Sequence, residues 1–315
     1  MRYMITLVLA STPALAEVPS VVTDIPPVHA LVAEVMGDLG QPVLLLARGA
    51  DEHDFQLKPS QAAAVAGSGL VVWVGPELTP WLDSAMENRA EGSPSLALLD
   101  AKGTQTRAYA EGEGEEEHAE DPAQKGTDHA AEEGHEDHGH DGTDPHAWLD
   151  PGNGQIWLGL IAAELSRLDP ANAATYAANA TAASNRIAAL DTELVALLAP
   201  VQGKPLVTFH SAYGYFADHY GLNLAGSIAL GDASSPGAQR LSDLRATMEA
   251  GAVLCIFPEA QHDPALVAQM AEGTGARIGG ALDPVGSTLE PGPGAYAALL
   301  KGIATTLADC VTGGT

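Results

Sequence analysis

Residues 169–200 read DPANAATYAANATAASNRIAALDTELVALLAP and contain a long helical pattern. Asp169 before Pro170 is typical of an N-cap followed by proline at the first helical position. Apolar residues then recur in steps of four and three at Ala183, Ile187, Leu190, Leu194 and Leu197. This spacing predicts a helix over 170–199 that Pro200 ends. At 1.5 Å per residue it would be roughly 45 Å long, which suits a stiff strut between two lobes.

Short β-rich runs alternate with helical patterns on both sides of this helix. Apolar runs of strand length lie before it at 18–25, 43–46, 70–74 and 96–99, and after it at 206–209, 222–230, 253–257 and 277–282. Alternation of this kind predicts mostly parallel sheets flanked by helices. We therefore expect an α/β fold of two similar lobes joined by one long rigid helix. A ligand in such a fold lies in the crevice between the lobes, at the carboxyl ends of strands.

The N-terminus has the features of a secretory signal. Arg2 supplies a positive end, residues 4–9 form a short apolar run, and residues 14–16 read Ala-Leu-Ala, a small-x-small cleavage site. We expect an exported protein, most simply a periplasmic one. The expected parts are a signal peptide at 1–16, an N-terminal α/β lobe at 17–169, the linking helix at 170–200 and a C-terminal α/β lobe at 201–315.

The N-terminal lobe includes an unusual segment at 111–144, which reads EGEGEEEHAEDPAQKGTDHAAEEGHEDHGHDGTD. It holds five histidines and fourteen carboxylates, and Lys125 is its only basic residue. No apolar period runs through it, so we expect a disordered loop. Imidazole and carboxylate both bind divalent transition metals, which favours metal contact over a plain acidic linker.

Charge and cysteine content narrow the choice of partners. The formal charge of −27 argues against nucleic acid and anionic membranes as partners, and the loop carries about half of this imbalance. The two cysteines, Cys255 and Cys310, lie in an apolar run and near the end of the chain. Export permits a disulfide between them; the alternative is one buried thiol and one free thiol.

Outside the loop, four candidate metal ligands stand mostly at the ends of apolar runs. They are His53, His146, His210 and Asp283. Three imidazoles and one carboxylate make a tetrahedral shell that suits Zn²⁺. Each histidine read alone is more often a structural residue. We assign none of His29, His219 and His262 to the site; the last two read as surface or capping residues.

Four stretches carry a resemblance to a known family. They are GADEHDFQLKPSQ at 49–61, DPHAWLDP at 144–151, VTFHSAYGYFADHYGL at 207–222 and ALDPVGS at 281–287. In this order they resemble the ZnuA-like, cluster A-I periplasmic zinc-binding proteins of ABC uptake systems. The resemblance covers nearly the whole mature chain. It includes the long helix and a His/acid-rich loop just before DPHAW.

The resemblance implies a role and a set of ligands. The protein would bind Zn²⁺ with high affinity between its lobes and deliver it to an ABC permease in the inner membrane. His53, His146 and His210 would be the imidazole ligands. Asp283 would be a fourth ligand or would hydrogen-bond a bound water, with Glu52 as its rival. The resemblance also supports the disulfide Cys255–Cys310. We expect a monomer, and a periplasmic metallochaperone is a further candidate partner.

Three alternatives stay open at this point. A secreted zinc hydrolase could use three histidines with Glu52 as general base, although the chain has neither HExxH nor GxSxG. A manganese-binding relative would typically have glutamate in place of His210, because oxygen ligands favour manganese. A metal buffer would bind its metal through the loop at 111–144.

Overall fold

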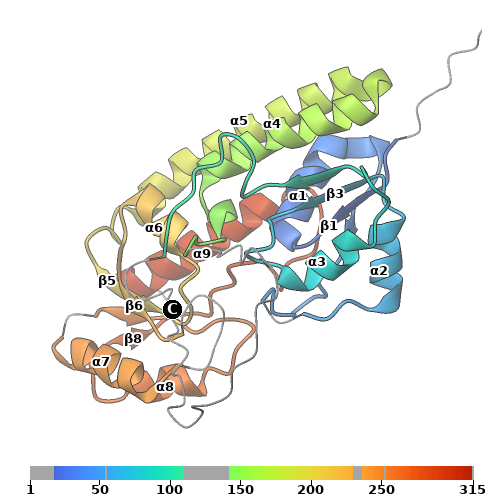
Figure 1. Cartoon of the computed structure of the whole chain (residues 1–315). Helices are drawn as coiled ribbons and strands as arrows, with labels where there is room; N and C mark the ends of the chain where they lie inside the picture. Colours follow the sequence, from blue (N-terminus) through green and yellow to red (C-terminus); the bar gives the residue numbers. More distant parts are fainter. Residues whose placement is uncertain (1–17, 54, 110–141, 230–235, 252, 314–315) are drawn as a thin grey trace, which may run out of the picture.

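Each half of the chain builds one four-stranded, all-parallel sheet (Figure 1). The structure is a computed structural model that describes residues 18–53, 55–109, 142–229, 236–251 and 253–313. The first sheet has the order β2-β1-β3-β4 and the second the order β6-β5-β7-β8. The strands are β1 (Val21–Thr23), β2 (Val43–Leu44), β3 (Leu70–Trp73), β4 (Ser95–Ala97), β5 (Pro205–Thr208), β6 (Asn223–Ser227), β7 (Cys255–Ile256) and β8 (Arg277–Ile278). The predicted fold class is confirmed.

Nine α-helices belong to the described part of the chain. They are α1 (Pro26–Met36), α2 (Pro59–Ala66), α3 (Pro80–Glu87), α4 (Pro151–Leu168), α5 (Ala173–Leu198), α6 (Gly214–Tyr220), α7 (Ala238–Glu249), α8 (Ala265–Ala271) and α9 (Ala295–Thr312). Short 3-10 turns occur at η1 (Gly37–Leu39), η2 (Ala147–Leu149) and η3 (Pro170–Asn172). No helix among these residues is long and apolar enough to cross a membrane.

Side chains on alternate positions of each strand pack against different helices, as the period of two requires. In β3, Leu70 and Val72 belong to the cluster shared with α1, α4 and α5, whereas Val71 and Trp73 pack with α2 and α3. In β5, Leu206 belongs to that same large cluster, and Val207 packs with α7 and α8. Both sheets are therefore covered on both faces, which is why their strands read as continuous apolar runs.

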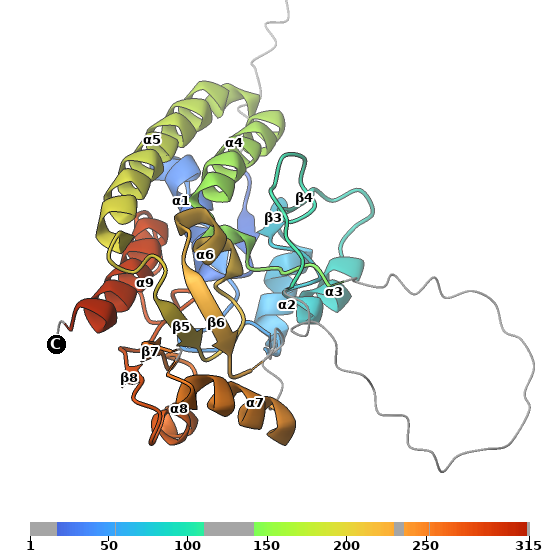
Figure 2. The same ribbon diagram turned by 90° about the vertical axis from the view of Figure 1, so that its left-hand side faces the viewer.

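The long helix α5 is packed along its length rather than spanning open space. It runs beside α4 and contacts α1 and α9 (Figures 1 and 2). Its buried residues are Tyr176, Ala180, Ala183, Ile187, Leu190, Leu194 and Leu198. The helix begins one 3-10 turn later than Asp169-Pro170 suggests, because the Asp169 carboxylate accepts hydrogen bonds from Asn172 (2.6 Å) and Tyr176 (2.9 Å) instead of capping it. The largest hydrophobic cluster includes residues of both lobes.

The expected disulfide is present and ties two elements of the C-terminal half together. Cys255 in β7 is bonded to Cys310 in α9. The expected signal peptide at 1–16 lies outside the described residues. The expected loop at 111–144 also lies outside them, apart from residues 142–144.

Candidate metal site

Three histidines from distant parts of the chain meet at the carboxyl ends of the strands. His53 lies in the segment between β2 and α2, His146 directly precedes η2, and His210 follows β5. One ring nitrogen from each lies within 4.8 Å of the others. The ring centroids are 4.9 to 5.3 Å apart. Among the described residues, this is the only group of three or more His, Cys, Asp or Glu side chains close enough to hold one ion.

The two nitrogens of His146 have different surroundings. Nδ1 lies 2.8 Å from Asp144 Oδ1, and Asp144 in turn accepts a hydrogen bond from Arg107 at 2.8 Å. A carboxylate beside Nδ1 keeps the proton there and leaves the lone pair on Nε2. Asp144, the first residue of the DPHAWLDP motif, therefore sets the tautomer of His146. Asp150 instead accepts from Gly152 N at 2.7 Å and caps α4.

Two nitrogens in this group have no hydrogen-bond partner. In the described part of the chain, Nε2 of His53 and Nε2 of His146 are both buried and unpaired. Buried polar atoms are normally paired, because leaving one unpaired costs free energy. A metal ion between the rings would satisfy both nitrogens at once. The donor set thus fits an ion that prefers imidazole, such as Zn²⁺.

Burial keeps these imidazoles in the form that binds metal. It lowers the pKa of His53 well below the usual range, and the nearby His210, His146 and His262 lower it further. Burial also lowers the pKa of His146, against the opposing effect of Asp144. Neutral rings with free lone pairs are therefore favoured at neutral pH.

Two buried glutamates stand beside the histidines. Burial raises the pKa of Glu52 to about 8, because transfer out of water disfavours the charged form. Its position is fixed by the Trp81 indole, which donates to the Glu52 carbonyl at 2.8 Å. Glu259 accepts a hydrogen bond from the Tyr213 hydroxyl at 2.8 Å, and its other oxygen is 3.5 Å from His210 Nδ1. Either carboxylate could add negative charge to a bound cation.

Asp283 follows β8 but is not among the three residues that come together. Its oxygens accept hydrogen bonds from the backbone of Ser287 and Thr288 and from the Thr288 hydroxyl. Asp283 also accepts from Gln261 Nε2 at 3.1 Å. Gln261 lines the cavity of the histidines, and its Oε1 is buried with no hydrogen-bond partner in the described part of the chain. Asp283 thus does not line the cavity itself but is hydrogen-bonded to Gln261, which does.

The structure places residues at this cavity that were not expected there from the sequence. The lining residues come from both lobes and are Asp51, Glu52, His53, His210, Glu259, Gln261, His262 and Pro284. Glu259, Gln261 and His262 follow β7, so the rule that polar groups gather at strand ends could have found them. His262 was expected to be a surface or capping residue; its side chain lies at the cavity and is 23% exposed.

The other two histidines that were left out of the site lie elsewhere. His29 is on α1, and its Nε2 lies 3.2 Å from the carbonyl of Pro42. His219 lies at the end of α6, where its ring contacts Asp150 and Asp191. Neither residue lines the cavity described above.

Comparison with known proteins gives a consistent family match. A family model described as ZnuA, zinc-uptake complex component A, periplasmic, matches residues 21–310. The high-affinity zinc uptake system protein ZnuA of Paracoccus denitrificans is 54% identical over 308 residues, which cover 96% of this chain and 94% of that protein. The protein of the same name from Brucella suis is 38% identical, with 93% and 91% covered.

Solved structures show the same fold. A crystal structure of ZnuA matches with a TM-score of 0.72 at 25% identity, covering 93% of this chain and 98% of that chain. A ZnuA deletion mutant with zinc bound matches with a TM-score of 0.70 at 25% identity, covering 92% and 97%. The Pseudomonas aeruginosa binding protein FpvC in complex with Mn²⁺ has a TM-score of 0.75 at 20% identity, covering 94% and 99%, and supports the fold alone.

Proposed function

Because this chain belongs to the ZnuA family of periplasmic zinc-uptake components, we propose that it binds Zn²⁺ through His53, His146 and His210 as cargo for uptake. The observation that carries the proposal is the set of three clustered imidazoles, two of which have a buried, unpaired Nε2. The family acts in transport, so the protein is a binding protein and not a zinc hydrolase.

The ligand types support zinc over manganese. Three imidazole nitrogens favour zinc, whereas a manganese site typically has more oxygen ligands. His210 is the residue that distinguishes a zinc-binding protein from a manganese-binding relative. Its side chain is only 3% exposed and lies beside Glu259, so the ring is held inside the site.

We propose that Asp283 acts as the fourth member of the site through Gln261. Asp283 and Ser287 both accept hydrogen bonds from Gln261 Nε2, while the buried Oε1 of this cavity-lining residue has no hydrogen-bond partner among the described residues. That oxygen can accept a hydrogen bond from a water bound to the ion. Glu52 is the rival for this position, because it is buried in the same cavity and could bind the metal directly once ionised.

We also propose a division of the chain into lobes and a set of partners. A lobe at 17–169, a linking helix at 170–200 and a lobe at 201–315 are supported by the presence of one sheet in each half. The protein would act as a monomer after removal of residues 1–16. It would hand zinc to an inner-membrane permease that a separate ATPase powers, and a periplasmic metallochaperone is a candidate donor of zinc.

The test is a zinc titration of the metal-free protein in competition with a tight chelating indicator. Loss of a second-sphere partner typically weakens metal binding 10- to 100-fold, so His210→Ala should weaken the tight site by more than about 100-fold. His219→Ala is the matched control, because His219 is also partly buried but contacts Asp150 and Asp191 away from the cavity.

A deletion of residues 111–141, which keeps Asp144 beside His146, separates this proposal from the metal-buffer alternative. We expect the deleted protein to keep one tight equivalent of zinc. If the deletion removes the tight equivalent while His210→Ala retains it, the histidine cluster is not the zinc site and the proposal fails.

A further inference from the structure

We propose that His262 and Asp51 form a transient zinc-capture site at the mouth of the histidine cavity, through which the ion passes to and from His210. This inference rests on the proposed zinc-binding function and adds a route to it. Both residues line the same cavity as His53 and His210. The side chains of His262 and Asp51 are 23% and 25% exposed, whereas those of His146 and His210 are 0% and 3% exposed. The pair is therefore more exposed to solvent than His146 and His210 are.

The spacing of the pair suits two ligands of one ion better than a hydrogen bond. His262 Nε2 lies 3.9 Å from Asp51 Oδ2 and 3.7 Å from Glu259 Oε2. Both separations exceed the usual limit of about 3.2 Å for a nitrogen–oxygen hydrogen bond. Two atoms that each bind one Zn²⁺ at about 2.0–2.2 Å in tetrahedral geometry stand about 3.4 Å apart. A small movement of either side chain thus suffices for His262 to share an ion with a carboxylate.

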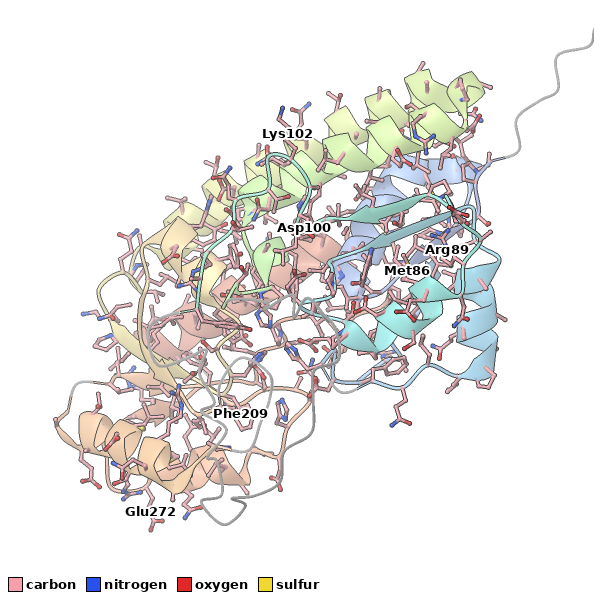
Figure 3. All side chains as sticks on the ribbon, viewed as in Figure 1. Met86, Arg89, Asp100, Lys102, Phe209 and Glu272 are labelled. Atoms are coloured by element: carbon pink, nitrogen blue, oxygen red, sulfur yellow. A yellow bond between two sulfur atoms is a disulfide. The ribbon has the colours of Figure 1, made fainter. Side chains whose placement is uncertain are left out.

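Local contacts hold both ligands in place. The His262 ring stacks on Phe209, which is labelled in Figure 3, with centroids 4.4 Å apart and planes 21° from parallel. The backbone N–H of His53 donates to Asp51 Oδ1 at 2.8 Å, and it is the other oxygen, Oδ2, that is nearest to His262. Asp51 comes from the N-terminal half and His262 from the C-terminal half, so the pair faces across the two lobes.

Glu259 connects the outer pair to the buried histidines. Its Oε2 is 3.7 Å from His262 Nε2 and 3.5 Å from His210 Nδ1, while Tyr213 holds its Oε1. An ion bound by His262 can therefore gain Glu259 as a ligand before it loses contact with His262. Exchanging ligands one at a time avoids stripping the ion of all protein partners at once. With two protein ligands and remaining water, the outer site binds weakly and releases the ion inward.

A purely structural role for His262 is the competing explanation, and kinetics separates the two. If His262 binds the ion only in passing, it lowers the free-energy barrier to zinc entry and to zinc exit alike. Its loss then slows binding and release by the same factor and leaves Kd unchanged. A structural residue that supports the histidine cluster would instead change Kd when it is lost.

The experiment is stopped-flow measurement of zinc association, and of zinc release to excess EDTA, on the full-length protein and on His262→Gln. We expect both rate constants to fall by the same factor, so that Kd stays unchanged. Asp51→Asn keeps an acceptor for the His53 N–H and should produce the same paired decrease. His219→Gln, which alters a histidine away from the cavity, should leave both rates unchanged.

Two results would overturn the proposal. Rates of His262→Gln and Asp51→Asn equal to wild type would exclude a relay, and faster release with a weaker Kd would assign His262 to structural support. Circular dichroism checks that each variant is folded, and if His262→Gln fails to fold, Asp51→Asn decides alone. A wild-type protein without any tight zinc site would refute the proposed function instead, so the two failures are distinguishable.

Discussion

At the scale of single residues, the cavity combines groups whose pKa values burial moves in opposite directions. His53 and His146 are shifted toward the neutral form, which is the form that binds metal. Glu52 is shifted toward its protonated form, which does not bind metal. The metal-free cavity therefore favours the neutral forms of His53, His146 and Glu52, which lowers the cost of bringing these groups together without an ion.

The pH dependence of zinc affinity follows from these shifts. Because the pKa values of His53 and His146 lie below 6.5, protons compete for these nitrogens only at lower pH. We expect affinity to change little between pH 7.5 and 6.5 and to fall as the pH decreases further. Indicator competition at several pH values, corrected for the indicator's own titration, measures this.

A different profile would change the ligand assignment. If affinity already falls about tenfold per unit between pH 8 and 7, a group that titrates there loses its proton on binding. Glu52, with a pKa of about 8, would then be a direct ligand, in contradiction to the indirect arrangement through Gln261.

The raised pKa of Glu52 should also make the stability of the metal-free protein depend on pH. Its pKa is raised from 4.5 to about 8 on folding, so the folded state holds the proton over a range in which the unfolded chain has released it. Stability is thus lost as the pH rises from about 4.5 to about 8, by about 1.4 kcal/mol per unit. Glu52→Gln should remove this loss.

Urea unfolding of the metal-free protein at pH 5, 6.5 and 8 provides the measurement. The gain in stability of Glu52→Gln over wild type should be larger at pH 8 than at pH 5. The exposed Glu91 serves as control, and Glu91→Gln should show no such trend. An equal gain at all three pH values would mean that Glu52 is not buried as the structure shows.

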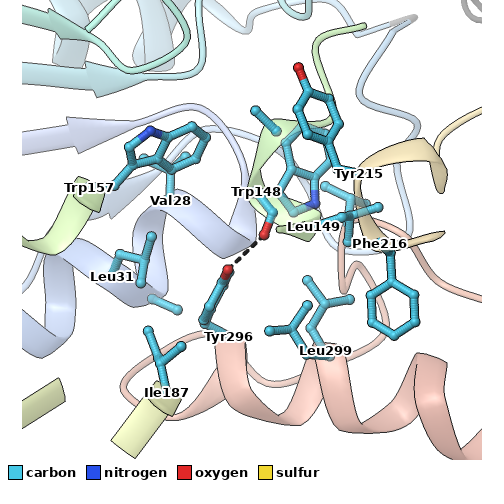
Figure 4. Packing of buried hydrophobic residues seen from close by; sticks show 14 of the residues in the cluster. Val28, Leu31, Trp148, Leu149, Trp157, Ile187, Tyr215, Phe216, Tyr296 and Leu299 are labelled. Carbon is cyan, nitrogen blue, oxygen red and sulfur yellow. Dashed lines mark hydrogen bonds between the residues drawn. The ribbon is translucent and has the colours of Figure 1, made fainter. Parts of the chain in front are cut away.

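At the scale of elements, α4, α5 and α9 pack tightly because small residues allow close approach. The Tyr296 hydroxyl of α9 donates to the carbonyl of Trp148 at 2.7 Å (Figure 4). Gly154 of α4 lies directly beside that hydroxyl, and a Cβ at this position would stand 2.4 Å from the Tyr296 oxygen. The Trp148 indole donates in turn to the carbonyl of Pro284, so this packing reaches the segment next to the cavity.

Two alanine substitutions in the same helix test this packing. Gly154→Ala should destabilise the protein by about 1–3 kcal/mol, because the new methyl group must displace the buried Tyr296 ring. Gly159→Ala meets nothing within 4 Å and should stabilise by about 0.5–1 kcal/mol through helix propensity. Thermal unfolding of both variants gives the comparison; equal effects would show that α9 does not pack against Gly154.

The disulfide between Cys255 and Cys310 should contribute measurably to the stability of the fold. It joins β7 to α9 across 55 residues, and closing a loop of this length in the unfolded chain stabilises the fold by about 4 kcal/mol. Replacing Cys255 and Cys310 together by alanine should lower the free energy of unfolding by about this amount. The tight zinc equivalent should remain, because neither cysteine lines the cavity. A variant of unchanged stability would contradict the prediction.

At the scale of the whole molecule, the two lobes share one hydrophobic core. Leu31 and Leu70 of the N-terminal half belong to the same cluster as Leu206 and Leu300 of the C-terminal half, with Ile187 of α5 between them. A continuous core of this kind makes the lobes depend on each other for stability. The arrangement holds His53 and His210, which come from different halves, at a fixed separation.

One cooperative unfolding transition is the expected consequence of the shared core. All four tryptophans lie before α5, at positions 73, 81, 148 and 157, so their fluorescence reports the N-terminal half and, through Trp148, its contact with Pro284 of the C-terminal half. Far-UV circular dichroism reports both halves. The two urea unfolding curves of the metal-free protein should coincide, and zinc at about 100 times Kd should shift both by about 2.7 kcal/mol. Separate transitions would show that the lobes unfold independently.

Much of this architecture could be predicted from local patterns. The apolar runs located the eight described strands to within a few residues, and the helix predicted over 170–199 is α5, which begins one 3-10 turn later. The motifs that carry His53, His146 and His210 pointed to a cluster that the structure assembles. The helices and strands depend on neighbours in the chain and so can be read from it, whereas the histidine cluster was expected from the family resemblance.

Only the tertiary structure decided which groups surround that cluster. Asp144 rather than Asp150 holds His146, Asp283 turns toward Ser287, Thr288 and Gln261, and His262 comes to the cavity beside Asp51 of the opposite lobe. His262 and Asp51 are more than 200 residues apart in the chain. Contacts of this kind arise where the two lobes meet beside shared helices, and no periodicity in the sequence records that placement.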